Sequence, residues 1–479
     1  MTTHGLYRPS VRLLVVLARQ GGLAPSLLSS VTLSSSSRFY LLVILVYDQV
    51  VISRRNAMRQ SSSSDESSAI NVAAPSPARA LSPTAPDRAT ELQRWLRALR
   101  AALPVYLLSR TLFALLSYLA PLFMLPNFSS LVLPLSSLVH SWHHWDAAHY
   151  TTIAQTGYTQ WWQTAFFPLF PLLEHLGAPL TLGSPHVAGL VIANLAGLAM
   201  LTVFYRLLAE DFSAALARRT LLYFVLFPSA FFLAAAYPES LFLLWSLLCF
   251  YGLRHQRWWL AGLYGLLAAL TRPAGLLLVV LFVYEYGSRC GWQLLRLRLS
   301  ALAAGLIPLG TVLFALYRLL RFGDPLAFSH AQACWNRYLD LPGLSVLQTM
   351  LSFFHAHLVS FDAIHNAFDL ICVLFIALLV TLCWVGPWRL PAERRGYALY
   401  ALLFCVFGLL WLTRGGAPLN AFPRYLLEAA PAFVVLGLLM EDTSEHWSRL
   451  RSVLGYYPIY ATALLSFALL QFLTGRWMV

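Results

Sequence analysis

Residues 187–207 read VAGLVIANLAGLAMLTVFYRL, and a stretch of this kind decides the fold class. Only one of its twenty-one side chains, that of Arg206, is charged. A helix needs about 20 consecutive apolar residues to cross the hydrocarbon core of a bilayer. Because lipid offers the backbone no hydrogen-bond partners, a helix that pairs its own N–H and C=O groups is the expected structure there. The stretch therefore predicts a membrane-spanning helix.

The rest of the chain repeats this pattern. Apolar stretches of the same character occupy ten further ranges: 101–123, 220–236, 239–253, 258–271, 275–287, 299–320, 367–386, 397–413, 424–440 and 453–474. Of all residues 59% are hydrophobic and 11% charged, whereas an ordinary soluble domain carries about 25% charged residues. Because several stretches are shorter than a full crossing, we expect an all-α polytopic membrane protein with about 9–13 transmembrane helices.

Arginines between the stretches orient the predicted bundle. With the N-terminus in the cytoplasm, sixteen arginines lie on the cytoplasmic side and seven on the opposite side, as the positive-inside rule requires. Residues 124–186 then form one large first external loop. Its apolar segment 165–183 lies in the interface or re-enters, since two prolines disrupt a straight helix there. The net charge of +13 follows from this topology and predicts no nucleic-acid binding.

The first 90 residues differ in composition from the rest. Serine runs occupy 34–37 and 61–64, and the segment 71–88 is rich in Ala, Pro and Ser. Such a segment buries too little apolar surface to fold. We expect residues 1–90 to be a disordered cytoplasmic tail, or in part a mis-assigned extension ahead of a start at Met58. Residues 91–479 are expected to form the transmembrane domain.

Polar motifs embedded in apolar sequence fall on the non-cytoplasmic side of this topology. Ionisable groups at membrane depth are costly and usually mark a functional site. The strongest candidate is Asp146, in Trp142–Tyr150 of the first external loop. Its carboxylate is suited to general-base chemistry, and the neighbouring Trp145, His149 and Tyr150 are candidates for binding substrate beside it. Two alternatives are a metal site that combines Asp146 with nearby histidines and a helix-capping role.

Seven further residues are candidates for binding substrate at this face: Glu239, Arg272, His330, Gln332, Arg337, Arg424 and Tyr425. The arginines suit a lipid phosphate, because the guanidinium fork matches phosphate oxygens. Headgroup contact is the alternative for each arginine. Glu239 either orients substrate or forms a buried ion pair with Arg272. His330 and Gln332 are candidates for hydrogen bonds to sugar hydroxyls.

Several other classes of function lack a signature. The sequence contains no Walker motif, HExxH, GxSxG or dinucleotide fingerprint, so nothing predicts ATP hydrolysis, proteolysis or redox chemistry. The six cysteines form no CxxC pair and are expected to be small buried hydrophobes. A lipid or solute transporter is the competing class, since broken helices with intramembrane charges also mark transporters. A transporter would show an internal repeat and polar groups near mid-membrane, and the sequence shows neither.

The loop sequence resembles the PIG-V family of mannosyltransferases. The resemblance is carried by His144–Tyr150 and Ala165–Leu172, followed in order by Ala236–Phe242, Thr271–Gly275 and Arg424–Leu426. It covers roughly residues 95–475. The family implies a GT-C glycosyltransferase architecture, a polyprenyl- or dolichyl-phosphate-mannose donor, and inverting transfer that gives an α-mannoside.

The resemblance also implies roles and a location. The usual base in this class is an acidic residue of the first external loop, and only Asp146 matches that place. Donors with a lipid monophosphate need no metal, so no cofactor is expected. The segment Asp324–Phe328 resembles bacterial members, which favours a bacterial plasma membrane and another lipid, glycan or protein acceptor over the glycosylphosphatidylinositol precursor in the endoplasmic reticulum. Transfer of another polyprenyl-phosphate-linked sugar is the alternative.

Overall fold

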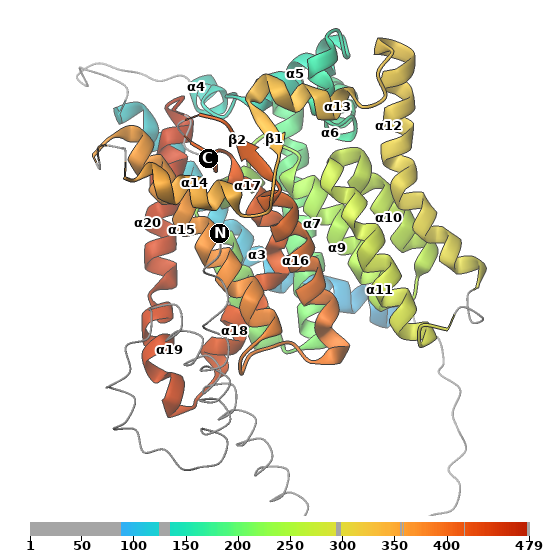
Figure 1. Ribbon diagram of the computed structural model, residues 1–479, viewed down its shortest axis with the longest axis vertical. Helices are drawn as coiled ribbons and strands as arrows, with labels where there is room; N and C mark the ends of the chain where they lie inside the picture. The colour runs from blue at the N-terminus through green and yellow to red at the C-terminus, as the bar shows by residue number, and fades with distance from the viewer. Residues whose placement is uncertain are drawn as a thin grey trace, which may run out of the picture. The chain divides into compact units, whose positions relative to one another are not determined.

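A computed structural model describes residues 88–123, 135–293, 298–354, 357, 359–415 and 417–476 (Figure 1). The chain is mostly helical (79%) with few strands, which confirms the expected helical membrane fold class. The tail expected over residues 1–90 lies outside the described residues except for its last three, which begin helix α3. The domain boundary at residue 91 therefore stays a prediction.

Six described helices are long and apolar enough to cross a membrane: Thr90–Leu119, Pro185–Asp211, Leu299–Phe322, Phe361–Trp384, Phe422–Glu441 and Glu445–Leu473. The expected spans 239–253, 258–271, 275–287 and 397–413 are also helical, but their helices α9 (Glu239–Arg254), α10 (Trp258–Thr271), α11 (Leu278–Cys290) and α16 (Arg395–Leu409) have 13 to 16 residues. At about 1.5 Å per residue these helices fall short of a full crossing.

The expected span over 220–236 is wrong as a single helix. Helix α8 (Ala214–Val225) ends early, and a 3₁₀ turn, η5 (Ala230–Leu233), follows Pro228. The segment is buried almost throughout, and the Ser229 hydroxyl donates to the Pro423 carbonyl at 2.7 Å. Irregular backbone is tolerated at membrane depth where protein surrounds it, so tertiary packing replaces the regular helix here.

Residues 135–186, the described part of the predicted first external loop, form a layer of short helices over one end of the bundle (Figure 1). Its elements are α4 (Leu135–His140), α5 (Asp146–Thr156), η3 (Trp161–Ala165), α6 (Leu169–Gly177) and η4 (Ala178–Thr181). Helix α6 has nine residues and packs on α5 and α7 (Pro185–Asp211). It is too short to span, as expected for the segment 165–183.

The second half of the chain returns to this end of the bundle. It contains η8 (Leu299–Gly305), α12 (Leu306–Phe322), α13 (Ala327–His330), η9 (Ala331–Trp335), β1 (Arg337–Leu339), α14 (Leu344–Ser352), α15 (Phe361–Trp384), η10 (Ala392–Arg394), β2 (Trp411–Thr413), α17 (Phe422–Leu426), η11 (Leu427–Ala432), α18 (Phe433–Glu441), η12 (Glu445–Trp447), α19 (Ser448–Gly455) and α20 (Tyr457–Leu473). Strands β1 and β2 pair antiparallel with Arg337 opposite Thr413. This pairing fixes two distant loops against each other above α17 (Figure 1).

A close approach of backbones holds the peripheral helix α12 against α10. A Cβ atom added at Gly262 would lie 2.3 Å from the Ala303 carbonyl oxygen, and one at Gly310 would lie 2.6 Å from that of Leu266. Small residues let helices in membranes pack this closely. The absence of a side chain therefore permits the approach of α10 to η8 (Leu299–Gly305) at Gly262 and to α12 at Gly310.

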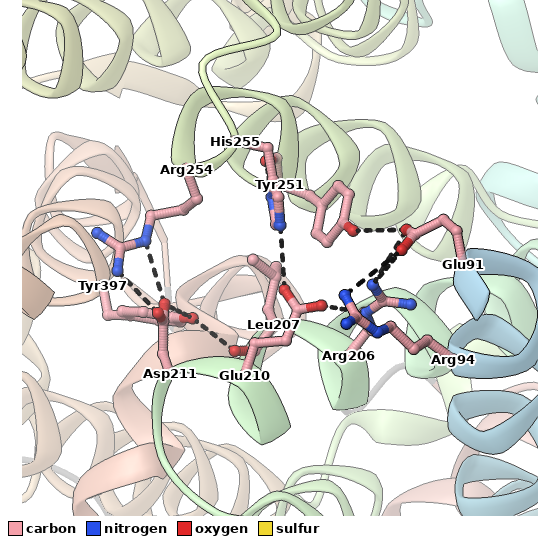
Figure 2. Close-up of polar contacts among 10 residues, drawn as sticks. All are labelled: Glu91, Arg94, Arg206, Leu207, Glu210, Asp211, Tyr251, Arg254, His255 and Tyr397. Carbon is pink, nitrogen blue, oxygen red and sulfur yellow. Dashed lines mark hydrogen bonds and ion pairs between the residues drawn. The ribbon is translucent and has the colours of Figure 1, made fainter. Parts of the chain in front are cut away.

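A set of polar contacts surrounds the C-terminal end of α9, and we call this set the opposite-end network (Figure 2). Its members are Glu91, Arg206, Glu210, Asp211, Arg254, His255 and Tyr397. The Arg254 guanidinium donates two bonds to Asp211 at 2.8 and 3.1 Å, and the Tyr397 hydroxyl donates to the same carboxylate at 2.7 Å. These contacts join the ends of α3 (Arg88–Leu119), α7, α9 and α16.

Candidate active site

A cavity of about 410 Å³ lies beneath the short helices of the first external loop. Nine of the eleven candidate site residues line it: Trp145, Asp146, His149, Tyr150, Arg272, Gln332, Arg337, Arg424 and Tyr425. They come from α5, the end of α10, η9, β1 and α17. The structure therefore gathers at one place residues that are up to 280 positions apart in the chain, as the one-sided polar motifs predict.

Asp146 begins helix α5 and points its carboxylate to the cavity wall. The residue before it, Trp145, has φ 56° and ψ −122°, and the helix has no side-chain cap. A positive φ at a bulky residue is uncommon and marks a constrained turn. The Asp146 carboxylate instead accepts a bond from Arg424 Nη1 at 2.7 Å. The helix-capping alternative for Asp146 is therefore wrong, because its side chain is committed to a tertiary ion pair.

Arg424 is the hub of the cluster. Besides Asp146, its Nε lies 3.1 Å from Glu239 Oε1, and its Nη2 donates to the Tyr425 hydroxyl at 3.1 Å. It sits in α17, which begins after Ala421 at φ 65° and has Pro423 in its first turn. Arg424 is buried, so each of these interactions is strengthened by the low local dielectric. One guanidinium thereby connects Asp146 at the start of α5 with Glu239 at the start of α9.

The predicted pair of Glu239 and Arg272 is present and has a third member. Arg272 Nη1 donates to Glu239 Oε1 at 2.7 Å, and Arg272 Nε lies 3.0 Å from Glu428 Oε1. All three side chains are buried, and Glu239 does not line the cavity. Sequence reasoning missed Glu428. Its signal was available, because it is an acidic residue inside the expected span 424–440.

Arg337 and Tyr425 form the opposite wall of the cavity. Arg337 Nη1 donates to the Tyr425 hydroxyl at 2.6 Å, and its guanidinium lies 4.7 Å from the centre of the Tyr425 ring and 5.5 Å from that of Trp411. The guanidinium of Arg272 lies 4.8 Å from the same tyrosine ring. One tyrosine therefore contacts all three site arginines, through its ring or its hydroxyl.

The aromatic residues near Asp146 have separate roles. His149 packs among Phe166, Trp162 and Trp335, with ring centres 5.0 to 6.3 Å apart. Tyr150 packs edge-on against Phe166 and Phe170. Burial raises the pKa of the Tyr150 phenol well above its usual value, so it stays a neutral hydroxyl. Sequence reasoning missed Trp335, Trp411 and Asn420 in the cavity lining, because isolated aromatic and amide residues in loops give no pattern.

The two polar candidates on the 330 loop differ in position. Gln332 lines the cavity, and its side chain donates to the Phe328 carbonyl at 3.4 Å. The His330 side chain is 61% exposed and its Nδ1 lies 2.7 Å from Asp324 Oδ2. Because His330 does not line the cavity, the structure gives no geometric support to a role for it in holding sugar.

The histidines beside Asp146 do not converge on it. His143 contacts the Thr151 hydroxyl at 3.2 Å and stacks on His186 with ring centres 4.3 Å apart. Burial lowers the pKa of His143 and of His144. Within the described ranges, no group of three or more His, Cys, Asp or Glu side chains is arranged to hold a metal ion. The metal alternative therefore has no ligand set in that part of the chain.

The arrangement combines the elements needed for acid–base chemistry beside an anion. A carboxylate stands at the cavity wall, where it can accept a proton. Guanidinium groups stand beside it, where they can stabilise developing negative charge. The cavity is large enough for a sugar-sized group at a volume within the usual range of ligand sites.

Comparison with known proteins gives three findings. The family model described as Mannosyltransferase (PIG-V) matches residues 105–307. GPI alpha-1,6-mannosyltransferase 2 of Mus musculus is 33% identical over 142 residues, which cover 28% of this chain and 29% of that protein. The Homo sapiens protein of the same name is 32% identical over 152 residues, which cover 28% and 30%. The chain thus matches about three-tenths of the length of these curated relatives.

Two solved structures show a distant overall likeness. ArnT from Cupriavidus metallidurans, bound to undecaprenyl phosphate, aligns with 80% of this chain and 76% of its own at 15% identity and a TM-score of 0.45. The apo oligosaccharyltransferase of Archaeoglobus fulgidus aligns with 79% and 56% at 12% identity and a TM-score of 0.44. Both scores lie below the level at which overall likeness defines a shared fold. The stretch that matches the Mannosyltransferase (PIG-V) family model, residues 105–307, includes Asp146, Glu239 and Arg272.

Proposed function

We propose that this protein is a membrane glycosyltransferase that transfers mannose from a polyprenyl- or dolichyl-phosphate carrier to a lipid-linked or other acceptor. The observation that carries the proposal is the 2.7 Å contact between Asp146 and Arg424 in the cavity wall. It places a potential base beside a cationic group at a site that can admit a sugar. The names of the curated relatives, GPI alpha-1,6-mannosyltransferase 2, support mannose as the sugar.

The proposed reaction is a single displacement with inversion. The acceptor hydroxyl oxygen forms a bond to the anomeric carbon while the bond from that carbon to the phosphate oxygen breaks. Asp146 takes the acceptor's proton, and the bonding electron pair leaves with the lipid phosphate. Guanidinium groups at the cavity stabilise the charge that develops on the leaving oxygen. The products are an α-mannoside, the lipid phosphate and a protonated Asp146 that returns its proton to solvent.

The arginine of the Asp146 pair has a specific role in this scheme. The Asp146 side chain is 19% exposed, so it reaches the cavity while remaining largely shielded from water. The Arg424 guanidinium donates to the Asp146 carboxylate at 2.7 Å. The same contact orients the carboxylate toward the cavity, which reduces the cost of positioning it during the reaction.

The proposed setting follows from the charge pattern of the sequence. The cavity is assigned to the non-cytoplasmic side, because the arginine-rich ends of the helices lie at the opposite-end network. We propose a GT-C arrangement, with the base in the first external loop. The bacterial-type segment 324–328 favours a bacterial plasma membrane and an acceptor other than the glycosylphosphatidylinositol precursor.

The test is transfer from labelled polyprenyl-phosphate mannose in membranes that contain the full chain. Wild type is expected to move label into a lipid or protein fraction, and Asp146→Asn to lower the rate by about 10²- to 10⁴-fold. Asp362→Asn is the matched control, because Asp362 is exposed in the first turn of α15 and does not line the cavity. Mass spectrometry of the labelled fraction identifies the acceptor.

Two outcomes would contradict the proposal separately. Near-normal transfer by folded Asp146→Asn protein would remove Asp146 from the role of base. Transfer by wild type from another polyprenyl-phosphate sugar, but not from the mannose donor, would overturn the choice of sugar and leave the base assignment standing.

A further inference from the structure

The three site arginines have different partners. Arg272 contacts the carboxylates of Glu239 at 2.7 Å and Glu428 at 3.0 Å. Arg424 contacts those of Asp146 at 2.7 Å and Glu239 at 3.1 Å. Arg337 has no carboxylate partner within the part of the chain that the structure describes, and its Nη1 donates to the Tyr425 hydroxyl. Only Arg337 therefore keeps an unneutralised positive charge at the cavity.

This difference decides which arginine suits an anion. A phosphate placed against Arg272 or Arg424 would also approach two carboxylates, and the repulsion would offset much of the attraction. Arg337 offers its charge without that opposition. Its Nε is buried and lacks a hydrogen-bond partner among the described residues, and a buried unsatisfied donor costs free energy until an acceptor arrives. Arg337 is therefore poised for an incoming oxygen.

The backbone holds Arg337 in place for this task. It begins β1 and pairs with Thr413 of β2, next to Trp411. Its side chain lines the cavity and rests against the rings of Trp411 and Tyr425. A guanidinium positioned by packing and by a strand pair loses less freedom on binding than a mobile one. The geometry is that of a preformed contact, rather than that of a mobile surface side chain.

A chain of short contacts links Arg337 to Asp146. The Tyr425 hydroxyl accepts bonds from Arg337 at 2.6 Å and from Arg424 at 3.1 Å, and Arg424 bonds Asp146 at 2.7 Å. Because this hydroxyl oxygen accepts twice, its hydrogen is directed elsewhere, and Tyr425 lines the cavity. The anion site and the base are thus fixed relative to each other by two side chains.

We propose that Arg337 binds the phosphate of the donor, whereas Arg272 and Arg424 hold carboxylates in position. The identity of the ligand rests on the proposed function, and the choice of arginine rests on the partners in the structure. A single uncompensated guanidinium matches a singly charged phosphodiester. A second phosphate in the cavity would meet the Asp146 carboxylate in the lining and two arginines already paired with carboxylates, so lipid diphosphates and nucleotide sugars fit this site less well.

The experiment measures binding without requiring turnover. Full-length protein in detergent or nanodiscs is titrated with farnesyl methyl phosphate, a phosphodiester with one charge, and with farnesyl diphosphate. Arg337→Met is expected to weaken phosphodiester binding about 10- to 100-fold, and Arg337→Lys to weaken it less. Wild type is expected to bind the diphosphate no more tightly than the phosphodiester.

The control is Arg414→Met, one residue beyond the end of β2. Arg414 is exposed, rests on the Tyr338 ring at 4.4 Å and does not line the cavity, so its loss is expected to leave binding unchanged. Size-exclusion profiles and helical circular dichroism establish that each variant is folded, and Arg337→Lys provides a second reading if Arg337→Met misfolds.

The inference is overturned if folded Arg337→Met binds the phosphodiester like wild type, if Arg414→Met loses as much affinity, or if the diphosphate binds more tightly. Those results would leave Asp146-dependent transfer intact. Conversely, absence of mannosyl transfer by wild type with Arg337-dependent phosphodiester binding would overturn the proposed function and leave this assignment standing.

Discussion

The two ends of α9 both collect arginines and carboxylates, but they use them differently. In the opposite-end network, Arg206 contacts Glu91 and Glu210, and Arg254 contacts Asp211 (Figure 2). Arg254 also lies 3.9 Å from Glu285, outside that network. Arg206 and Arg254 thus each contact two carboxylates. At the cavity, Arg272 and Arg424 also contact two carboxylates each, whereas Arg337 contacts none among the described residues. The lesson is that a buried ion-pair network marks a functional site only where a charge is left for a ligand.

The second difference concerns burial. The cavity-end carboxylate Glu239 is almost fully buried, whereas the Glu210 side chain of the network is 31% exposed. Removing one partner of a buried ion pair leaves an uncompensated charge in a low dielectric, and the cost rises steeply with burial. Exposed pairs are screened by water and contribute little. The two ends should therefore respond unequally to matched substitutions.

The largest expected effect is the difference between Glu239→Gln and Glu210→Gln in the loss of the free energy of unfolding. Glu239→Gln leaves Arg272 and Arg424 facing each other without their shared carboxylate, and we expect a loss of about 3–5 kcal/mol in the free energy of unfolding. Glu210→Gln should cost ~1 kcal/mol or less. Unfolding of purified protein in mixed micelles measures both. Equal losses would show that the two networks contribute equally to stability, and would contradict the expected dependence on burial.

A tyrosine in each network, Tyr397 and Tyr425, allows a second matched pair of substitutions. Tyr397→Phe removes the hydroxyl that donates to Asp211 and to the Leu207 carbonyl, and should cost about 1–2 kcal/mol of stability without changing transfer per folded molecule. Tyr425→Phe removes the oxygen that holds Arg337 and Arg424, and should lower transfer about tenfold. Mannosyl transfer normalised to folded protein distinguishes them. An unaffected rate in Tyr425→Phe would separate the Tyr425 contacts from the reaction.

The smallest expected effect is the pH dependence that the His255–Glu210 pair of the opposite-end network contributes to stability. The bond from His255 to Glu210 raises the pKa of His255 above its ordinary value of 6.5. A raised pKa means that this contribution is fully present below about pH 6.5 and is lost as the pH rises through the folded-state value. The loss should stay below about 1 kcal/mol, because the pair is partly exposed. Thermal unfolding between pH 6 and 9 should show this decline in wild type, and a decline of the same size in His255→Gln would contradict it.

Much of this site was predictable from composition and order. Asp146, Arg272 and Arg424 stand out because charged side chains are rare in apolar sequence and each must find a partner. The Glu239–Arg272 pair was an open alternative that the structure shows to be present. His330 was a candidate for hydrogen bonds to sugar hydroxyls, but its side chain contacts Asp324 and does not line the cavity. A single polar residue in a loop does not determine where its side chain points.

The amino-acid sequence was sufficient to predict a helical membrane protein with polar motifs gathered at one end, because hydrophobic length and charge asymmetry are local properties that can be read residue by residue. Three features required the tertiary structure. The segment 220–236 is not one continuous helix, Glu428 pairs with Arg272, and Arg337 has no carboxylate partner within the described residues. These outcomes depend on which side chains meet across helices far apart in the chain. Pairing of that kind is set by packing in three dimensions, and no local pattern encodes it.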